Sequence, residues 1–535
     1  MAVMATGALG FLQRFLRIGF EGAERRLDRL FGPAGNPLGQ LGTIAFFLYW
    51  IVAVSGIYLY IFFSTSVADA YESVERLTHA QWYAGGVLRS LHRYASDAMV
   101  VLMLLHLLRE FSLDRYRGTR WFSWLTGVPL LWFVYASGVT GYWLVWDRLA
   151  QYVAIASFEW LDWLPIFGEP IARNFLVPGS LTDRFFTLLV FLHIAIPLIL
   201  LFIMWIHLQR LSQPRMNPPR AVAAVTLMTL TALSLAYPAV SQGPADLATV
   251  PAAVKLDWFY LAIYPLFDVW SFGAVWGLVG GGTLLLLLVP WLPPLRRPAP
   301  AVVVPAHCNG CGRCVEDCPY TAVALGPRTD GQAHFSHQAV VDASVCVSCG
   351  ICVGACPSST PFRRTTDLAT GIDLPDLSLQ ELRERTHAAA ARARGAVRLL
   401  VFGCQHGADV TALEADGSGT ITVPCIAMVP PPLIDYALSR GLADGLVLAG
   451  CAESACFNRL GVAWTKERLA GTRDPYLRPR VPRERLATVW AGASEGRRLR
   501  EETRALRDRL AALPARALAS EGRAPGHTAD KETVT

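Results

Sequence analysis

Residues 89–109 read RSLHRYASDAMVVLMLLHLLR and place His92 and His106 fourteen positions apart within one apolar segment. A later apolar segment repeats this interval with His193 and His207. Fourteen residues make almost four turns of an α-helix, so both histidines of a segment are expected on one face, about 21 Å apart along the axis. Ionisable residues within membrane-spanning segments are rare and usually functional. Single membrane histidines can also join helices by hydrogen bonds, but two matched pairs favour two sites for b-type haem.

Six stretches in the first 295 residues are long and apolar enough to cross a bilayer, and the histidine segments are the second and fourth of them. The second and fourth spans cross in the same direction. His92 is therefore expected level with His193 near the outer face, and His106 level with His207 near the inner face. The predicted spans are 42–63, 86–108, 123–146, 184–208, 221–240 and 270–292.

Arginine is distributed unevenly around the predicted spans. It gathers in the connections 109–120, 209–220 and 295–297, whereas the alternate connections are poorer in basic residues. The positive-inside rule then predicts a multi-pass protein of the inner membrane, with its N-terminus and its C-terminal half in the cytoplasm. Residues 1–30 are amphipathic and predict a surface helix rather than a signal peptide. Because the basic residues flank apolar spans, nucleic acid is not an expected partner.

Four glycines repeat the interval of the histidines. Gly42 and Gly56 on the first span are fourteen apart, as are Gly127 and Gly141 on the third. A flat macrocycle pressed against a helix needs a position without a Cβ atom, which glycine supplies. Glycine in membrane helices more often serves helix packing, but the shared interval favours contact with the haems.

The first half of the chain resembles the cytochrome b of bc-type quinol-oxidising complexes, over roughly residues 15–295. The resemblance implies two b haems, and it implies that Arg89 and Arg109 pair with haem propionates. Each arginine could instead be a plain anchor at the membrane surface. The motifs that carry it are Asn36-Pro37-Leu38, Arg89-Ser90-Leu91-His92, Leu105-His106-Leu107-Leu108-Arg109 and Gly141-Tyr142-Trp143-Leu144-Val145-Trp146-Asp147.

The connection between the fifth and sixth predicted spans contains AAVKLDWFY at residues 252–260. It resembles the Pro-Glu-Trp-Tyr segment of the same family, whose glutamate takes a proton from quinol at the outer site. Asp257 stands at the position of that glutamate, and Leu256 at that of the proline. Asp257 is therefore the candidate proton acceptor for quinol. The alternative is an interfacial loop whose aromatic residues lie at headgroup level.

Two cysteine runs share one spacing. Residues 308–319 read CNGCGRCVEDCP and residues 346–357 read CVSCGICVGACP. This is the ligand spacing of a two-cluster ferredoxin, in which the fourth cysteine of each run binds the other cluster. It disfavours disulfides and zinc. The expected [4Fe–4S] ligands are Cys308, Cys311, Cys314 and Cys356 (the first set), and Cys346, Cys349, Cys352 and Cys318 (the second set).

Four further cysteines follow predicted buried strands or lie in the loops after them, and they form the third set: Cys404, Cys425, Cys451 and Cys456. The strands are expected at 397–402, 421–424 and 446–449, with a helix at 432–440. Cysteine is often a small buried hydrophobe, but cysteines that follow strand ends can converge on one site.

Residues 397–498 resemble the delta subunit of methyl-viologen-reducing hydrogenase. The resemblance implies that the third set binds a [2Fe–2S] cluster. It also implies a soluble partner that contains flavin or iron–sulfur centres, of the heterodisulfide-reductase type. The matching motifs are Val423-Pro424-Cys425, Gly445-Leu446-Val447-Leu448-Ala449-Gly450-Cys451 and Ala493-Ser494-Glu495-Gly496.

The expected fold is multidomain: an all-α transmembrane cytochrome b bundle, an α+β ferredoxin-like two-cluster domain, and a small α/β domain. Residues after about 515 lack apolar periodicity and are expected to be disordered. The expected boundaries are 1–41 for the surface helix and lead-in, 42–297 for the six spans, 298–365 for the two-cluster domain, 366–396 for a linker with a helix, 397–498 for the [2Fe–2S] domain, and 499–535 for a helix and tail.

These features predict a subunit of a quinone/quinol oxidoreductase. Electrons would pass between quinol at an outer-face site and a cytosolic oxidoreductase, through the haems and clusters. A multi-subunit, dimeric complex in contact with membrane lipid and quinone is the expected assembly. Two alternatives stay open: an electron-wire subunit without its own quinone site, and a structural anchor for a cytosolic redox complex.

Overall fold

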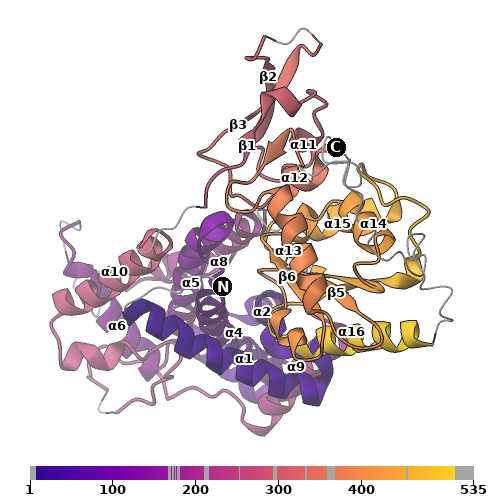
Figure 1. Ribbon diagram of the computed structural model, residues 1–535. Helices are drawn as coiled ribbons and strands as arrows, with labels where there is room; N and C mark the ends of the chain where they lie inside the picture. The colour runs from indigo at the N-terminus through magenta and orange to yellow at the C-terminus, as the bar shows by residue number, and fades with distance from the viewer. Residues whose placement is uncertain are drawn as a thin grey trace, which may run out of the picture. The chain divides into compact units, whose positions relative to one another are not determined.

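The computed structural model describes residues 8–166, 170–171, 174, 176, 181–209, 216–251, 253–292, 298–331, 334–357, 368–453 and 456–512 (Figure 1). The chain forms two compact units that meet in the sequence at Pro293 and Pro294. The arginine-rich connections near 210–215 and 293–297 lie outside the described residues, as does the predicted tail after 515.

The first unit is built of helices. Two pairs make its centre: α2 packs on α4, and α5 packs on α8. The buried side chains between them are mostly aliphatic, such as Leu48, Val100, Val134 and Leu189. The helices are α1 (Ala8–Gly35), α2 (Leu41–Phe62), α3 (Ala70–Glu75), α4 (Val87–Ser112), α5 (Trp121–Val145), α6 (Arg148–Asp162), α8 (Asp183–Leu208), α9 (Arg220–Ala236) and α10 (Phe272–Leu288).

Five helices in the described part of the chain, rather than the six predicted, are long and apolar enough to cross a membrane. The exception is α9, whose 17 residues rise only about 25 Å. It ends early because Pro238 disfavours helix at Tyr237. It packs on α4, and the Tyr94 hydroxyl of α4 donates to the Tyr237 carbonyl just after α9 at 2.5 Å.

The N-terminal helix α1 lies against the first unit as a surface helix. It exposes Phe11, Phe15 and Ile18, whose exposed fractions are 73%, 67% and 69%. Its buried side carries Glu24, which pairs with Arg109 of α4 at 2.6 Å. The amphipathic pattern of the sequence thus produces a helix with one apolar face outward, as a helix at a membrane surface requires.

The second unit begins with the two cysteine runs. Each run continues into a very short helix, and the residue before each helix is a glycine in the left-handed conformation: Gly312 with φ 78° and Gly350 with φ 75°. A side chain with a Cβ atom is strained there, so glycine permits the sharp turn. The elements are β1 (Val302–Val303), α11 (Arg313–Glu316), β2 (Val323–Pro327), β3 (His337–Val341), α12 (Ile351–Ala355) and β4 (Ile372–Asp373).

A parallel sheet in the order β6-β5-β7-β8 forms the rest of the second unit. Strand β5 is buried on both faces: Leu400 and Phe402 pack with α13 and α14, while Leu399 and Val401 pack with α16. The bounds are α13 (Leu379–Arg392), β5 (Leu399–Cys404), β6 (Gly419–Val423), α14 (Pro431–Ser439), β7 (Gly445–Gly450), α15 (Gly461–Ala470), β8 (Leu486–Trp490) and α16 (Gly496–Ala511).

Candidate functional site

The four predicted histidines lie inside the four-helix centre of the first unit. His92 on α4 and His193 on α8 face each other, with ring centroids 6.3 Å apart and planes at 58°. His106 and His207, one interval further along the same helices, are also near enough to interact electrostatically. The structure therefore groups the histidines into the two pairs that the crossing direction of the spans predicts.

The ring nitrogen Nδ1 of three histidines is held by hydrogen bonds. His92 Nδ1 lies 2.9 Å from the Val52 carbonyl oxygen, and His193 Nδ1 lies 3.0 Å from that of Ser137. A carbonyl oxygen only accepts, so these Nδ1 atoms carry the proton and Nε2 keeps its lone pair. His207 Nδ1 has a hydroxyl partner, Thr126 Oγ1, at 3.0 Å. A histidine that binds iron is commonly oriented through its other nitrogen in this way.

Hydroxyl groups reinforce the same orientation, and sequence reasoning missed them. Ser55 and Thr140 lie 3.1 and 3.2 Å from Nδ1 of His92 and His193. Each hydroxyl donates to a carbonyl one turn back in its own helix, so its oxygen accepts the imidazole proton. A signal for them was present: Ser55, Thr126 and Thr140 each directly precede one of the four glycines.

Each of the four glycines faces one histidine. A Cβ atom on Gly56 would lie 3.0 Å from Cε1 of His92, and one on Gly141 would lie 3.0 Å from Cε1 of His193. The corresponding distances are 3.6 Å from Gly42 to His106 and 3.4 Å from Gly127 to His207. The bare backbone therefore provides a flat wall beside every imidazole, and these residues fit a haem at each pair.

Replacing Gly56 by leucine should displace His92, because the new side chain starts within contact distance of its ring. We expect the spectrum of one b haem to shift or disappear while the other is kept. Low-temperature absorption spectra of the reduced protein measure this. Gly277→Leu is the control, since a Cβ atom on Gly277 meets nothing within 4 Å. An unaltered spectrum in Gly56→Leu would contradict a haem beside this helix.

The two candidate propionate ligands have protein partners. The Arg89 guanidinium lies 3.5 Å from Glu75 and donates to Ser241 Oγ at 2.8 Å. Arg109 pairs with Glu24 at 2.6 Å and with Glu110 at 3.2 Å. Both arginines are thus held in place by acidic side chains, and their role toward propionates stays a prediction.

Asp257 is buried, unlike an ordinary loop carboxylate: 7% of the residue is exposed. The Tyr142 hydroxyl of α5 donates to Asp257 Oδ2, and the Phe259 amide donates to Oδ1 at 2.8 Å. The Arg93 guanidinium of α4 lies 3.6 Å away and 5.4 Å from the centre of the Tyr142 ring. Trp258, the residue after Asp257, is 69% exposed, as expected for an interfacial aromatic residue.

The loop thus combines both alternatives considered for it. Its aromatic residues Trp258 and Phe259 point outward, while Asp257 and Tyr260 point inward. The arrangement gives a carboxylate with two fixed donors and a nearby cation. A carboxylate held in this way can accept a proton from a bound hydroxyl group.

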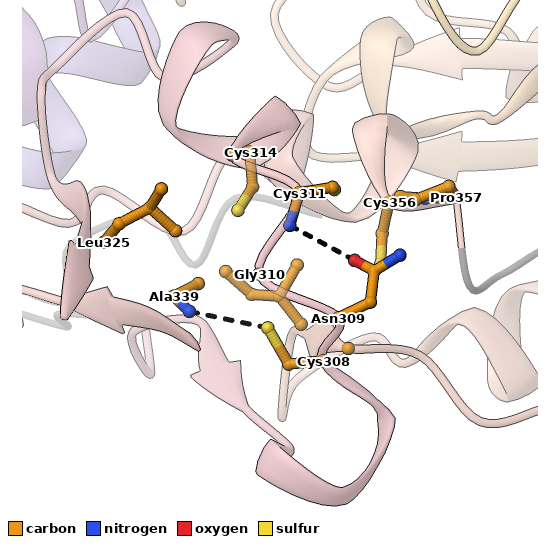
Figure 2. Close-up of a pocket in the computed structure, with 12 residues that line it drawn as sticks. Cys308, Asn309, Gly310, Cys311, Cys314, Leu325, Ala339, Cys356 and Pro357 are labelled. Atoms are coloured by element: carbon orange, nitrogen blue, oxygen red, sulfur yellow. Dashed lines mark hydrogen bonds between the residues drawn. The ribbon is translucent and has the colours of Figure 1, made fainter. Parts of the chain in front are cut away.

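The four cysteines of the first set line one pocket (Figure 2). Cys356 comes to it from the second run, as the two-cluster spacing predicts. Gly310 lies in the pocket wall, and a Cβ atom there would be only 2.4 Å from the His337 carbonyl oxygen. The Ala339 amide donates to the Cys308 sulfur at 3.4 Å, as amides do to cluster ligands. The donor set and the amide fit a [4Fe–4S] cluster.

The cysteines of the second set also come together. Cys352 interacts electrostatically with Cys346, Cys349 and Cys318, and with Cys314 of the first set. Amides donate to two of its sulfurs: Ala301 to Cys346 at 3.4 Å and Ala322 to Cys318 at 3.2 Å. The two sets are therefore neighbours in one small domain.

The third set gathers at the carboxyl ends of the parallel strands. Cys404 ends β5, Cys425 follows β6 and Cys451 follows β7, and all four cysteines of the set are buried. The sulfurs of Cys404 and Cys451 are 3.6 Å apart. Four buried thiols at one sheet edge are a donor set that a [2Fe–2S] cluster fits.

Burial raises the pKa of the Cys314 thiol to about 12 and that of Cys352 well above its usual range. Without iron these thiols therefore carry protons at neutral pH. Only thiolates bind iron, so cluster assembly must release those protons.

Three known protein families match successive parts of the chain. The family Cytochrome b/b6/petB matches residues 34–214, the 4Fe-4S dicluster domain matches residues 307–360, and the family "Methyl-viologen-reducing hydrogenase, delta subunit" matches residues 415–514. The last match begins after Cys404 and ends beyond the predicted boundary at 498.

Individual relatives resemble the first part. Cytochrome b of Rickettsia prowazekii (strain Madrid E) is 25% identical over 290 residues, which are 48% of this chain and 71% of the relative. Cytochrome b6 of Porphyra purpurea is 29% identical over 192 residues, which are 35% of this chain and 87% of the relative. A chain of a solved structure, "Hyperthermophilic respiratory Complex III", is 22% identical with a TM-score of 0.40, covering 48% of this chain and 76% of that one. The three family matches show that the chain contains, in this order, a cytochrome b/b6 domain, a 4Fe-4S dicluster domain and a domain of the methyl-viologen-reducing hydrogenase delta-subunit family.

Proposed function

We propose that this chain carries electrons between quinol in a membrane and a cytosolic oxidoreductase. The observation that carries the proposal is the pairing of His92 with His193 and of His106 with His207, each imidazole beside its own glycine. A b haem at each pair would supply a one-electron carrier, so electrons could cross the bilayer. Electron movement across the full membrane couples to the membrane potential by about 2.3 kcal/mol per 100 mV.

The residues of the first unit have distinct tasks in this proposal. The four histidines would bind the two haem irons, and the glycines Gly42, Gly56, Gly127 and Gly141 would let the macrocycles approach the helices. Arg89 and Arg109 stand near the ends of the histidine helix, where propionates would be bound. Asp257 accepts a proton from the quinol hydroxyl, while Tyr142 and Arg93 hold its carboxylate.

The second unit continues the route in the cytoplasm. The first and second sets would each hold a [4Fe–4S] cluster, and the third set a [2Fe–2S] cluster. The expected recipient or donor is a soluble subunit with flavin or iron–sulfur centres, of the heterodisulfide-reductase type. The chain would thus be one subunit of a quinone/quinol oxidoreductase in the inner membrane, within a dimeric multi-subunit complex, with its N-terminus and iron–sulfur domains in the cytoplasm.

Asp257→Asn tests the quinone site. The amide keeps the size of the side chain: its oxygen can still accept from the Phe259 amide, and its NH2 group can donate to the Tyr142 hydroxyl oxygen, but it takes no proton from quinol. We expect quinol-driven haem reduction to fall by about 10²- to 10⁴-fold, the range for loss of a general base. Stopped-flow absorption measures the rate, and dithionite should still reduce both haems fully.

Asp246→Asn is the matched control, because Asp246 lies in the same connection but on its exposed side. It should leave the rate unchanged. Full quinol-driven reduction in Asp257→Asn would instead favour an electron wire that has no quinone site of its own.

A further inference from the structure

The chain segments that carry the second and third cysteine sets pack against each other inside the second unit. Cys349 and Ile351 of the second run pack in one apolar cluster with Cys425, Ala427 and Trp464. Cys349 and Cys425 are also close enough to interact electrostatically. Cys349 of the second set and Cys425 of the third thus meet in one small apolar cluster.

The backbone is in close contact between these segments. A Cβ atom on Gly354 would lie 2.1 Å from the Ala427 carbonyl oxygen, and one on Gly350 would lie 2.7 Å from Met428 Sδ. On the other side, a Cβ atom on Gly461 would lie 2.3 Å from the Cys425 sulfur and 3.8 Å from Ile351 Cδ1. No side chain can fit between the segments that carry the cysteines. The contact is therefore a fixed part of the fold.

A single buried arginine joins the segments. Arg468 of α15 is 1% exposed. Its guanidinium forms an ion pair with Asp317 and donates to the Ala427 carbonyl at 2.7 Å and to the Ile351 carbonyl at 3.5 Å. Each of these three partners is one or two residues away from a cysteine of the second or third set. Arg468 thus bridges the chain segments that carry the two sets.

The first set has a different position. The residues that line its pocket all lie between Cys308 and Ile372, so the C-terminal sheet contributes nothing to it (Figure 2). Cys311 in that set is exposed, whereas Cys425 is 1% exposed. Cys314 of the first set and Cys352 of the second belong to one buried cluster and are close enough to interact electrostatically. The three sets therefore form a series with the second set in the middle.

We propose that the Cys349–Cys425 contact is the direct electron path between the dicluster domain and the C-terminal domain, with Arg468 as its positioning residue. With clusters bound, a single electron would pass from the centre held by the second set to the centre held by the third, so that one is oxidised as the other is reduced, and no bond or proton would move. Electrons would then enter or leave the other end of the series at the first set, where Cys311 is exposed. This inference rests on the proposed function, because it assigns an order to the iron–sulfur sites named there.

Paired serine substitutions at equivalent positions of the two runs test the order. Cys349 and Cys311 are each the second cysteine of their run, so Cys349→Ser and Cys311→Ser disable the second and first sites by the same chemical change. The full chain is reduced with dithionite, and the relaxation of the [2Fe–2S] electron paramagnetic resonance signal is measured, with iron content as a check. A paramagnetic neighbour speeds this relaxation only at short range.

We expect fast relaxation in the unmodified chain and in Cys311→Ser, and its loss in Cys349→Ser. Fast relaxation that survives Cys349→Ser, or that disappears in Cys311→Ser, would overturn the proposed order. If Cys349→Ser does not fold, the Cys311→Ser result decides alone. The measurement uses no quinol. The proposed order can therefore be overturned while quinol still reduces the haems, and the order can hold even if quinol does not reduce them.

Discussion

His193→Leu is expected to remove one of the two b haems and with it about half of the b-type absorbance. His193 faces His92 at a centroid distance of 6.3 Å, and both rings present Nε2 because their Nδ1 atoms are hydrogen-bonded to backbone carbonyls. Leucine has no atom that binds iron, and His92 alone cannot complete a bis-imidazole site. The haem at His106 and His207 should remain. Pyridine haemochrome quantification of the purified chain measures the loss.

The control for this experiment is His79→Leu. His79 is the histidine of the first unit that does not belong to either pair, and its side chain is 68% exposed beside Glu75. Its replacement should keep the full haem content. Full haem content in His193→Leu would remove the basis of the proposed function. An unmodified chain without b-type haem would favour the structural anchor for a cytosolic complex.

Arg468→Met should destabilise the second unit strongly. The side chains of Arg468 and Asp317 are 2% and 3% exposed, so the substitution leaves a buried carboxylate without its nearest cation. Loss of one partner of a buried ion pair costs about 3–5 kcal/mol. Arg473 also pairs with Asp317, so we expect the lower end of that range. The temperature at which the iron–sulfur absorbance of the full chain is lost measures the effect.

Two further variants identify the cause. Adding Asp317→Asn to Arg468→Met should restore part of the stability, because the buried charge is then removed. Arg385→Met removes an exposed pair with Glu381 and should change the stability by no more than about 0.5 kcal/mol. A double variant no more stable than Arg468→Met would show that the stranded carboxylate is not the source of the loss.

The grouping of the histidines and of the first cysteine set could be predicted from residue spacing alone. Helical periodicity places His92 and His106 on one face, and the direction of each span follows from the number of crossings before it. Their grouping with His193 and His207 could therefore be predicted without coordinates. The first set, with Cys356 from the other run, was likewise predictable because its spacing is specific to one kind of cluster.

Other features were predicted only in part. The fifth predicted span is the 17-residue helix α9, since hydropathy gives no account of where Pro238 ends the helix. Strand β8 and its place at the edge of the sheet were missed, because Leu486–Trp490 has no strong alternation of apolar and polar residues. The hydroxyls that orient the imidazoles were also missed, although they precede the glycines.

By itself, the sequence determined the apolar helices of the first unit and the order of the domains, and it predicted the cofactor sites, because these depend on spacings within short segments of chain. The tertiary structure alone decided that Asp257 is buried against Tyr142 and Arg93, and that Arg468 joins the second and third cysteine sets. The Asp257–Tyr142 and Arg468–Asp317 contacts connect residues more than a hundred positions apart. Their formation depends on how whole elements pack, and no local pattern of residue types records that packing.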